Sequence, residues 1–173
     1  MTVTLERPVS TNARAAVRRA TGADHDYLAT LLARTSAASL ARRFLTGMSG
    51  RPSPGLVSYL LLADRPGDAY LAFDGPDAVG HAMWVPLRPE RAGGPLTAEI
   101  ALLVRDDHQR RGIASDLLDA IAVGLREAGI AWVQATTSAD NRVANALVQR
   151  RRPGVRPTRD GADLTYLMPV WPT

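Results

Sequence analysis

The residues that could do chemistry gather between Glu99 and Ala114. An apolar run, Ile100 to Val104, ends at two aspartates, and a basic turn, Gln109-Arg-Arg-Gly112, then leads into an amphipathic segment. A turn of this kind at a helix N-terminus offers free backbone N–H groups, the positive end of the helix dipole and, at glycine, close backbone approach. The turn therefore predicts a binding site for a phosphate group.

Glu99 precedes the same apolar run and has Ala98, Ile100 and Ala101 around it. These neighbours predict partial burial, which raises the pKa of a carboxyl group toward the pH at which it can act as a base. Glu99 is therefore the candidate base, and the alternative is a solvated glutamate at the end of a strand.

The spacing of apolar residues predicts a chain in which strands and helices alternate. The Arg-Pro-Ser-Pro-Gly stretch at 51–55 is predicted to be a loop because of its prolines and glycine. Asp160-Gly161 predicts a hairpin turn between two final strands. The other strands are expected at 16–20, 69–73, 78–85, 100–104 and 130–137, and the helices at 24–34, through Leu40 to Leu45, and at 56–63, 113–128 and 140–151.

The strand, the turn Gln109-Arg-Arg-Gly-Ile-Ala114 and the helix together resemble the signature of the GNAT superfamily of acetyl-CoA-dependent N-acyltransferases. The resemblance implies an α/β fold with a mixed, partly antiparallel central sheet of six to seven strands and helices on both faces. It also implies direct transfer of an acetyl group from acetyl-CoA to an amine, with Glu99 as general base and no metal ion.

The resemblance further implies which residues hold acetyl-CoA. Backbone N–H groups of the turn bind the pyrophosphate, and a bulge or splay around Leu102–Val104 frees backbone groups for the pantetheine arm. Arg110 and Arg111 supply charge or are solvated loop cations, and Asn141 contacts the pantetheine or caps a helix. The implied set is Leu102, Leu103, Val104, Gln109, Arg110, Arg111, Gly112, Ile113, Ala114, Ser115 and Asn141.

Two segments, Ser39-Leu-Ala-Arg-Arg-Phe44 and Ala98 to Gln109, are similar to bacterial protein lysine acetyltransferases of the Pat type. This favours a protein lysine as the amine acceptor. A small-molecule amine, such as an aminoglycoside or a polyamine, and a non-catalytic acyl-CoA-sensing or protein-binding module are the alternatives. The chain departs from the family because Ala146 to Gln149 lacks the tyrosine that serves many members as general acid. It also carries a cluster, Arg150-Arg151-Arg152, that is a solvated surface or a contact for an acidic partner or the 3′-phosphate of CoA.

Composition sets the remaining expectations. The length of 173 residues, 46% of them hydrophobic, predicts a single domain at 16–173. The polar character of residues 1–15 predicts a flexible tail there. There is no cysteine, and the three histidines lack metal-ligand spacing. No apolar run is long enough for a membrane span, which favours a cytoplasmic protein without a membrane partner. All 21 basic residues are arginine, but the net charge of +4 is weak support for a nucleic-acid partner. The acyl-chain preference, the regulation and a possible homodimer stay open.

Overall fold

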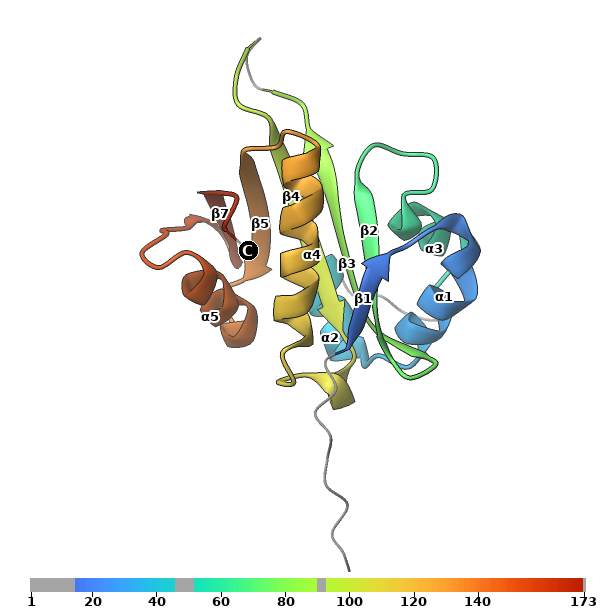
Figure 1. Ribbon diagram of the computed structural model, residues 1–173. Helices are drawn as coiled ribbons and strands as arrows, with labels where there is room; N and C mark the ends of the chain where they lie inside the picture. The colour runs from blue at the N-terminus through green and yellow to red at the C-terminus, as the bar shows by residue number, and fades with distance from the viewer. Residues whose placement is uncertain (1–14, 46–51, 90–92, 173) are drawn as a thin grey trace, which may run out of the picture.

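The computed structural model describes residues 15–45, 52–89 and 93–172, so that the expected tail lies almost wholly outside the described part of the chain. Seven strands form one sheet in the order β1-β2-β3-β4-β5-β7-β6 (Figure 1). The pair β4–β5 is parallel, and the other recorded pairs are antiparallel. The strands are β1 Ala16–Arg19, β2 Asp68–Asp74, β3 Asp77–Leu87, β4 Thr97–Val104, β5 Trp132–Ser138, β6 Thr158–Asp160 and β7 Asp163–Pro169.

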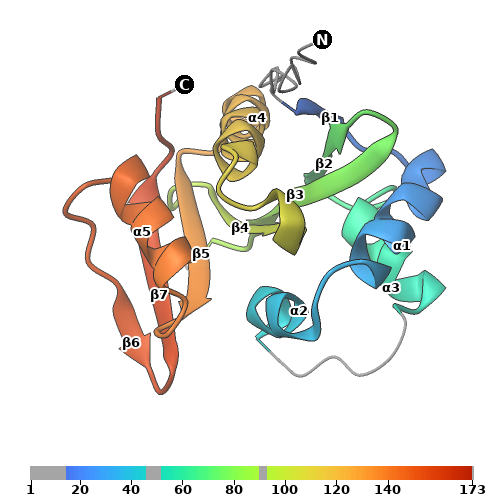
Figure 2. The same ribbon diagram turned by 90° about the horizontal axis from the view of Figure 1, so that it is seen from below.

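Helices cover both faces of this sheet, as the sequence predicts. Helices α4 and α5 pack on one face, and α1, α2 and α3 pack on the other (Figure 2). Two short 3₁₀ turns, η1 Gly22–Asp24 and η2 Asp106–His108, precede α1 and the α4 turn. The helices are α1 His25–Ala33, α2 Ala37–Phe44, α3 Pro54–Leu61, α4 Ile113–Glu127 and α5 Arg142–Arg151. None of the helices within the described residues has the length and apolar character that crossing a bilayer requires.

The alternation of side chains along β4 divides its residues between two cores. Ala98 and Val104 belong to the core under α4, while Leu103 belongs to the core under α1, α2 and α3. Glu99 has the same parity as Leu103, so its side chain projects toward the second face. Glu99 and helix α4, which follows the turn at Gly112, thus lie on opposite faces of β4.

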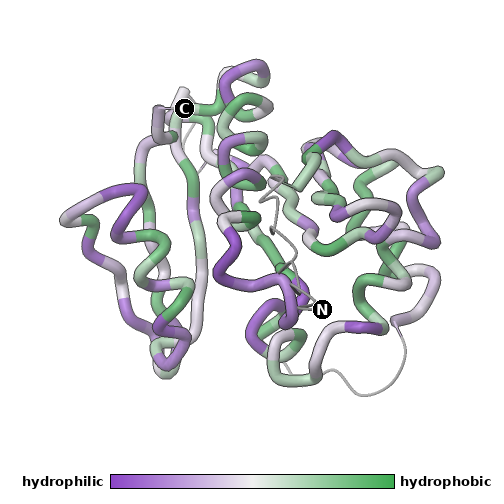
Figure 3. Tube along the Cα trace, turned by 60° about the horizontal axis from the view of Figure 1, so that its bottom comes forward, coloured by the Kyte–Doolittle hydropathy of each residue, from purple (hydrophilic) through white to green (hydrophobic). Residues whose placement is uncertain are grey.

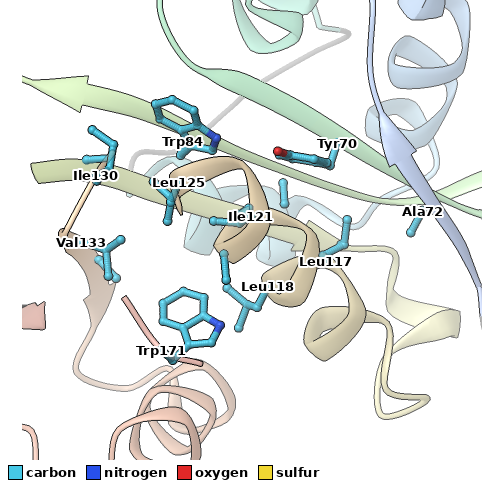
Figure 4. Close-up of a cluster of buried hydrophobic side chains, with 14 of the residues drawn as sticks. Tyr70, Ala72, Trp84, Leu117, Leu118, Ile121, Leu125, Ile130, Val133 and Trp171 are labelled. Atoms are coloured by element: carbon cyan, nitrogen blue, oxygen red, sulfur yellow. The ribbon is translucent and has the colours of Figure 1, made fainter. Parts of the chain in front are cut away.

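Helix α4 is held by the apolar stripe that its sequence predicts. Leu117, Ile121 and Leu125 are fully buried against the sheet, and Trp84 and Val133 lie around them (Figure 4). Burial of a side chain of this size stabilises a fold by about 1.5–3 kcal/mol. The stripe therefore fixes α4, and with it the turn at its N-terminus, relative to β4.

The predicted strands and helices are confirmed with small shifts of their ends, and one assignment is wrong. Pro54 and Gly55 belong to α3 and not to a loop at 51–55. Ser53 accepts a hydrogen bond from Leu56 N–H at 3.2 Å and caps the helix, and Pro54 occupies the first turn. Proline is tolerated there because the N–H group it lacks would have no intrahelical partner.

Gly124 lets α4 approach the sheet closely, because a Cβ at this position would lie 2.1 Å from the Tyr70 hydroxyl. We expect Gly124→Ala to lower the free energy of unfolding by about 1–3 kcal/mol, the usual cost of overpacking a core. Gly55→Ala is the matched control, since Gly55 is also helical and a Cβ there meets nothing within 4 Å. Urea unfolding followed by circular dichroism measures both. A Gly124→Ala variant as stable as the wild type would contradict the close packing.

Candidate active site

The sheet opens between its two central strands. The parallel ladder pairs Thr97, Ala98 and Glu99 of β4 with β5 and goes no further. On its other side, β4 pairs with β3 as far as Val104. The backbone groups of Ile100–Val104 that point toward β5 therefore have no strand partner. This is the splay that the resemblance implied around Leu102–Val104.

Two adjoining cavities follow the opening. The first, of about 260 Å³, is lined at one end by Glu99 and is called the Glu99 cavity here. The second, of about 250 Å³, reaches the turn at Gly112 and is called the Gly112 cavity. Both are lined by Arg42, Arg43, Leu102, Asn141, Ala144 and Leu147. A path lined by described residues thus leads from the phosphate turn to Glu99.

Glu99 lies where the two strands part, and it is exposed. The predicted partial burial is therefore wrong. The apolar neighbours Ala98 and Ile100 alternate to the opposite face of the strand and do not cover the carboxylate. Among the described residues that line the Glu99 cavity, Glu99 is the single acid. A carboxylate at this point can accept a proton from a group that enters the cavity.

The turn before α4 has the backbone form that an anion site needs. Arg110 and Gly112 have φ angles of +63° and +88°, and Gly112 is the N-cap of α4. The N–H groups of Ile113 and Ala114, in the first turn of the helix, have no intrahelical acceptor. Arg110 and Arg111 are exposed on this strongly hydrophilic turn (Figure 3).

The expectation that all N–H groups of Gln109–Ala114 are available is wrong at its first residue. Gln109 N–H donates to the Asp106 carbonyl at 3.3 Å, because η2 closes on itself there. The Gln109 side chain donates to the Val104 carbonyl at 3.1 Å and so ties the turn to the end of β4. The Ser115 N–H donates to the Gly112 carbonyl at 2.8 Å. Gln109 and Ser115 line the Gly112 cavity, but their N–H groups are used within the protein.

Asp106 connects this turn to α2, a link that the sequence analysis did not find. Its carboxylate accepts hydrogen bonds from Ser36 N–H at 2.9 Å, from the Ser36 hydroxyl at 2.8 Å and from the Ser39 hydroxyl at 2.6 Å. Burial acts to raise the pKa of Asp106, but these donors outweigh it and lower the pKa below its usual value. The start of α2 is thereby held against the loop that follows β4.

Asn141 and Asn145 fix α5 at the other wall of the cavities. The Asn141 side chain accepts a hydrogen bond from Ala144 N–H at 3.2 Å and so caps α5, while the residue also lines both cavities. Asn145 accepts hydrogen bonds from the hydroxyls of Thr137 at 2.5 Å and Tyr166 at 3.1 Å, and it donates to the Ser138 carbonyl at 3.2 Å. The sequence showed Asn145 one turn after Asn141, but nothing local indicated that it joins α5 to β5 and β7.

The three arginines that end α5 have separate roles. Arg151 bonds to Asp119 at 2.5 Å and to the Ser115 carbonyl at 2.8 Å, so it bridges α5 and α4. Arg152 donates to the carbonyls of Pro169 and Val170. Arg150 is exposed and lines the Gly112 cavity. One of the three residues therefore remains available to a ligand in that cavity.

The two histidines near the site are structural. His81 is buried, and its Nε2 lies 3.1 Å from the Leu60 carbonyl, while burial lowers its pKa to about 3. A neutral imidazole that is buried in the core and lines neither cavity has a structural role. His108 lies between Asp107, 2.7 Å from its Nδ1, and Asp74, 3.1 Å from its Nε2. Its ring nitrogens are thus occupied by the loop itself.

An apolar strand, a glycine-capped helix and a parallel pair that opens beside an acid form the geometry of the site. A model of the acetyltransferase (GNAT) family matches residues 29–152, which include all of these features. The chain belongs to the GNAT acetyltransferase family. Members of this family use acetyl-CoA to acetylate amines, so this chain is an N-acetyltransferase by family.

Solved structures of several acetyltransferases are similar to this chain. The GNAT domain of PAT from S. lividans has 26% identity and a TM-score of 0.77 over 90% of each chain. An acetyltransferase from Thermus thermophilus has 25% identity and a TM-score of 0.64 over 89% of this chain and 97% of that one. PaiA N-acetyltransferase from Thermoplasma acidophilum, solved in complex with coenzyme A, has 14% identity and a TM-score of 0.67 over 90% of this chain and 98% of that one, which shows the shared fold.

Gly112 gives a first test of the site, since its φ of +88° strains any residue with a Cβ. An alanine at this φ angle carries strain of about 1–2 kcal/mol, which the backbone relieves by a change that turns the N–H groups of the turn away from the ligand. We therefore expect Gly112→Ala to weaken CoA binding by about tenfold. Isothermal titration calorimetry measures the dissociation constant.

The matched control is Gly129→Ala at the opposite end of α4, where φ is +71° and a Cβ meets nothing within 4 Å. Both variants should lose similar stability in thermal unfolding. Equal dissociation constants for CoA in the two variants would remove the Gly112 turn from the binding site.

Proposed function

We propose that this protein transfers the acetyl group of acetyl-CoA directly to the side-chain amine of a protein lysine, with Glu99 as general base. The observation that carries the proposal is the position of Glu99. It lies exposed in the cavity where β4 and β5 part, at the opposite end of the opening from the Gly112 turn. Val104 lies five residues after Glu99 along the strand, a distance of about 17 Å, which an extended pantetheine arm can follow.

The residues around the opening fit acetyl-CoA. The first-turn N–H groups of α4 would hold the pyrophosphate, and Arg110 and Arg150 line the cavity at the same end. Arg111 is exposed on the same turn but lines neither cavity.

The open edge of β4 offers the backbone groups of Leu102 and the Val104 N–H to the amides of the pantetheine arm. The backbone of Leu103 alternates toward β3, and the Val104 carbonyl already accepts a hydrogen bond from Gln109. Asn141 uses its oxygen as a helix cap, which leaves the amide nitrogen for the same arm.

A general base is the main catalytic group that the reaction requires from the protein. Acetyl-CoA supplies the acyl group as a thioester. Glu99 takes a proton from the lysine ammonium, directly or through one water, and the free amine then attacks the acyl carbonyl carbon. A C–N bond forms and the C–S bond breaks. The nitrogen then loses its second proton, which passes through water to the departing CoA thiolate, so that the products are the amide and the CoA thiol. The ordinary pKa of a thiol, about 8.5, makes the thiolate a tolerable leaving group near neutral pH.

The choice of a protein lysine rests on likeness. The segment Ser39–Phe44, which is similar to Pat-type protein lysine acetyltransferases, lies on α2. Its last three residues, Arg42, Arg43 and Phe44, line the Glu99 cavity. The overall likeness to the GNAT domain of PAT supports the same acceptor class.

The role of Glu99 is tested by Glu99→Gln. We expect the turnover number to fall by about 10²–10⁴-fold at pH 7.5, the usual contribution of a general base, with CoA affinity unchanged. The deficit should shrink as the pH rises toward 10, because a lysine amine with a pKa near 10.4 then loses its proton to water. Release of CoA thiol measured against pH gives both results.

Glu127→Gln is the matched control. Glu127 is exposed at the far end of α4, where it pairs with Arg19 at 3.0 Å and lines neither cavity. It should keep the wild-type rate at every pH. If Glu99→Gln also keeps that rate, another group takes the proton.

A further inference from the structure

Helix α2 brings two adjacent arginines, Arg42 and Arg43, to the cavities. Ser36 caps the helix, and Asp106 holds its first turn in place. The helix contacts both β4 and β5, so that it lies across the opening between the strands (Figure 2). Both arginines line the Glu99 cavity. Both also line the Gly112 cavity, so their positive charge is fixed by the fold where the two cavities adjoin, beside the cavity that the acceptor amine must enter.

Arg43 has partners that do not balance its charge. Its guanidinium lies 3.3 Å from the Met83 sulfur and 5.0 Å from the centre of the Phe44 ring. No carboxylate of a described residue lies within ion-pair distance of it. Burial lowers the pKa of Arg43 to about 10, although the Glu99 carboxylate and Tyr59 act to raise it. A half-buried guanidinium with five donors normally binds a carboxylate or phosphate, so this one is poised for an anion.

The other cations of the cavities have separate tasks. Arg110 and Arg150 line the Gly112 cavity at the phosphate end, and Arg151 bonds to Asp119 and the Ser115 carbonyl. Met83 pairs with Ala101 on β4, two residues from Glu99, which places the Arg43 guanidinium near the base. Arg42 is exposed and has no ion pair with a described residue. Among the described residues, Arg42 and Arg43 thus have no ion-pair partner, and the acid nearest to their cavity lining, Glu99, acts on Arg43 only through its charge.

A lysine ammonium that enters the Glu99 cavity meets two positive charges, and like charges at short range oppose binding. We propose that Arg42 and Arg43 form an anion subsite for the acceptor, and that the lysine acetylated by this protein has acidic side chains beside it in the peptide. This inference rests on the proposed function. A carboxylate on the peptide pairs with the guanidinium groups while the lysine reaches Glu99, so that the acceptor is recognised by its charge pattern.

Three peptides test the subsite. They carry one lysine and differ at the two positions on either side of it, which are all Glu, all Gln or all Arg. With the wild-type protein we expect kcat/KM for the Glu peptide to exceed that for the Gln peptide by about tenfold, as one charge-assisted pair allows, and the Arg peptide to be slowest. The preference should weaken as salt is raised, because the pairs are partly exposed.

Arg43→Gln and Arg42→Gln should each reduce the preference, and the double variant should remove it. Arg42 is exposed, so its variant keeps the test valid even if Arg43→Gln unfolds. Arg156→Gln is the matched control, since Arg156 is exposed and lines neither cavity. It should keep the wild-type preference. CoA affinity is measured for each variant, because both arginines also line the Gly112 cavity. A change in kcat/KM that is the same for all three peptides reports on CoA, whereas a change in the ratio between the peptides reports on the acceptor subsite.

Two results would overturn the proposal, and they differ. Equal kcat/KM for all three peptides, or a preference that survives in the double variant, would overturn the anion subsite and leave the lysine acceptor standing. Failure to acetylate any peptide, with CoA binding intact, would overturn the protein-lysine acceptor itself and the subsite with it. Charge reversal adds a positive test, because Arg42→Glu should favour the Arg peptide.

Discussion

The site depends on the early end of the parallel ladder between β4 and β5. Backbone N–H and C=O groups need partners, and those of Ile100–Val104 that point toward β5 find none in that strand. Each strand is nevertheless held in place by its other neighbour, since β3 pairs with β4 as far as Val104 and β7 pairs with the whole of β5. The opening therefore belongs to two well-ordered half-sheets and can take an extended ligand as a missing strand.

Side-chain contacts around the opening keep its walls at a set distance. Arg151 bridges α5 to Asp119 on α4, while Asn145 joins α5 to the β5–β7 half-sheet. On the opposite face, Asp106 holds the start of α2. These polar contacts are satisfied within the protein, so they cost little desolvation and define one arrangement. The fold thus prepares both ends of the path before any ligand arrives, which lowers the entropic cost of binding.

Local pattern predicted much of this fold, and tertiary contact decided the rest. The strand, the turn at Gly112 and the stripe on α4 were predictable because each depends on neighbours in the chain. Pro54 was wrongly assigned to a loop, because proline disrupts a helix in its interior but is tolerated in its first turn. The exposure of Glu99 depends on where β5 leaves β4, and the bonds of Asn145 depend on β7. These contacts join residues that are far apart in the sequence, so no local sequence pattern predicts them.

A general acid is less needed here than a base. The α5 wall that many family members equip with tyrosine carries Ala144, Leu147 and Val148 in this chain. Tyr166 donates its hydroxyl to Asn145, lines neither cavity, and has its pKa raised by burial, which makes it a poorer acid. A thiol has a pKa of about 8.5, so the CoA thiolate is stable enough to leave near neutral pH without prior protonation. A lysine ammonium has a pKa of about 10.4, so it keeps its proton near neutral pH unless a base removes it. Proton removal from the amine is therefore the harder step, and Glu99, the one carboxylate among the described residues that line the Glu99 cavity, is the group that we propose for it.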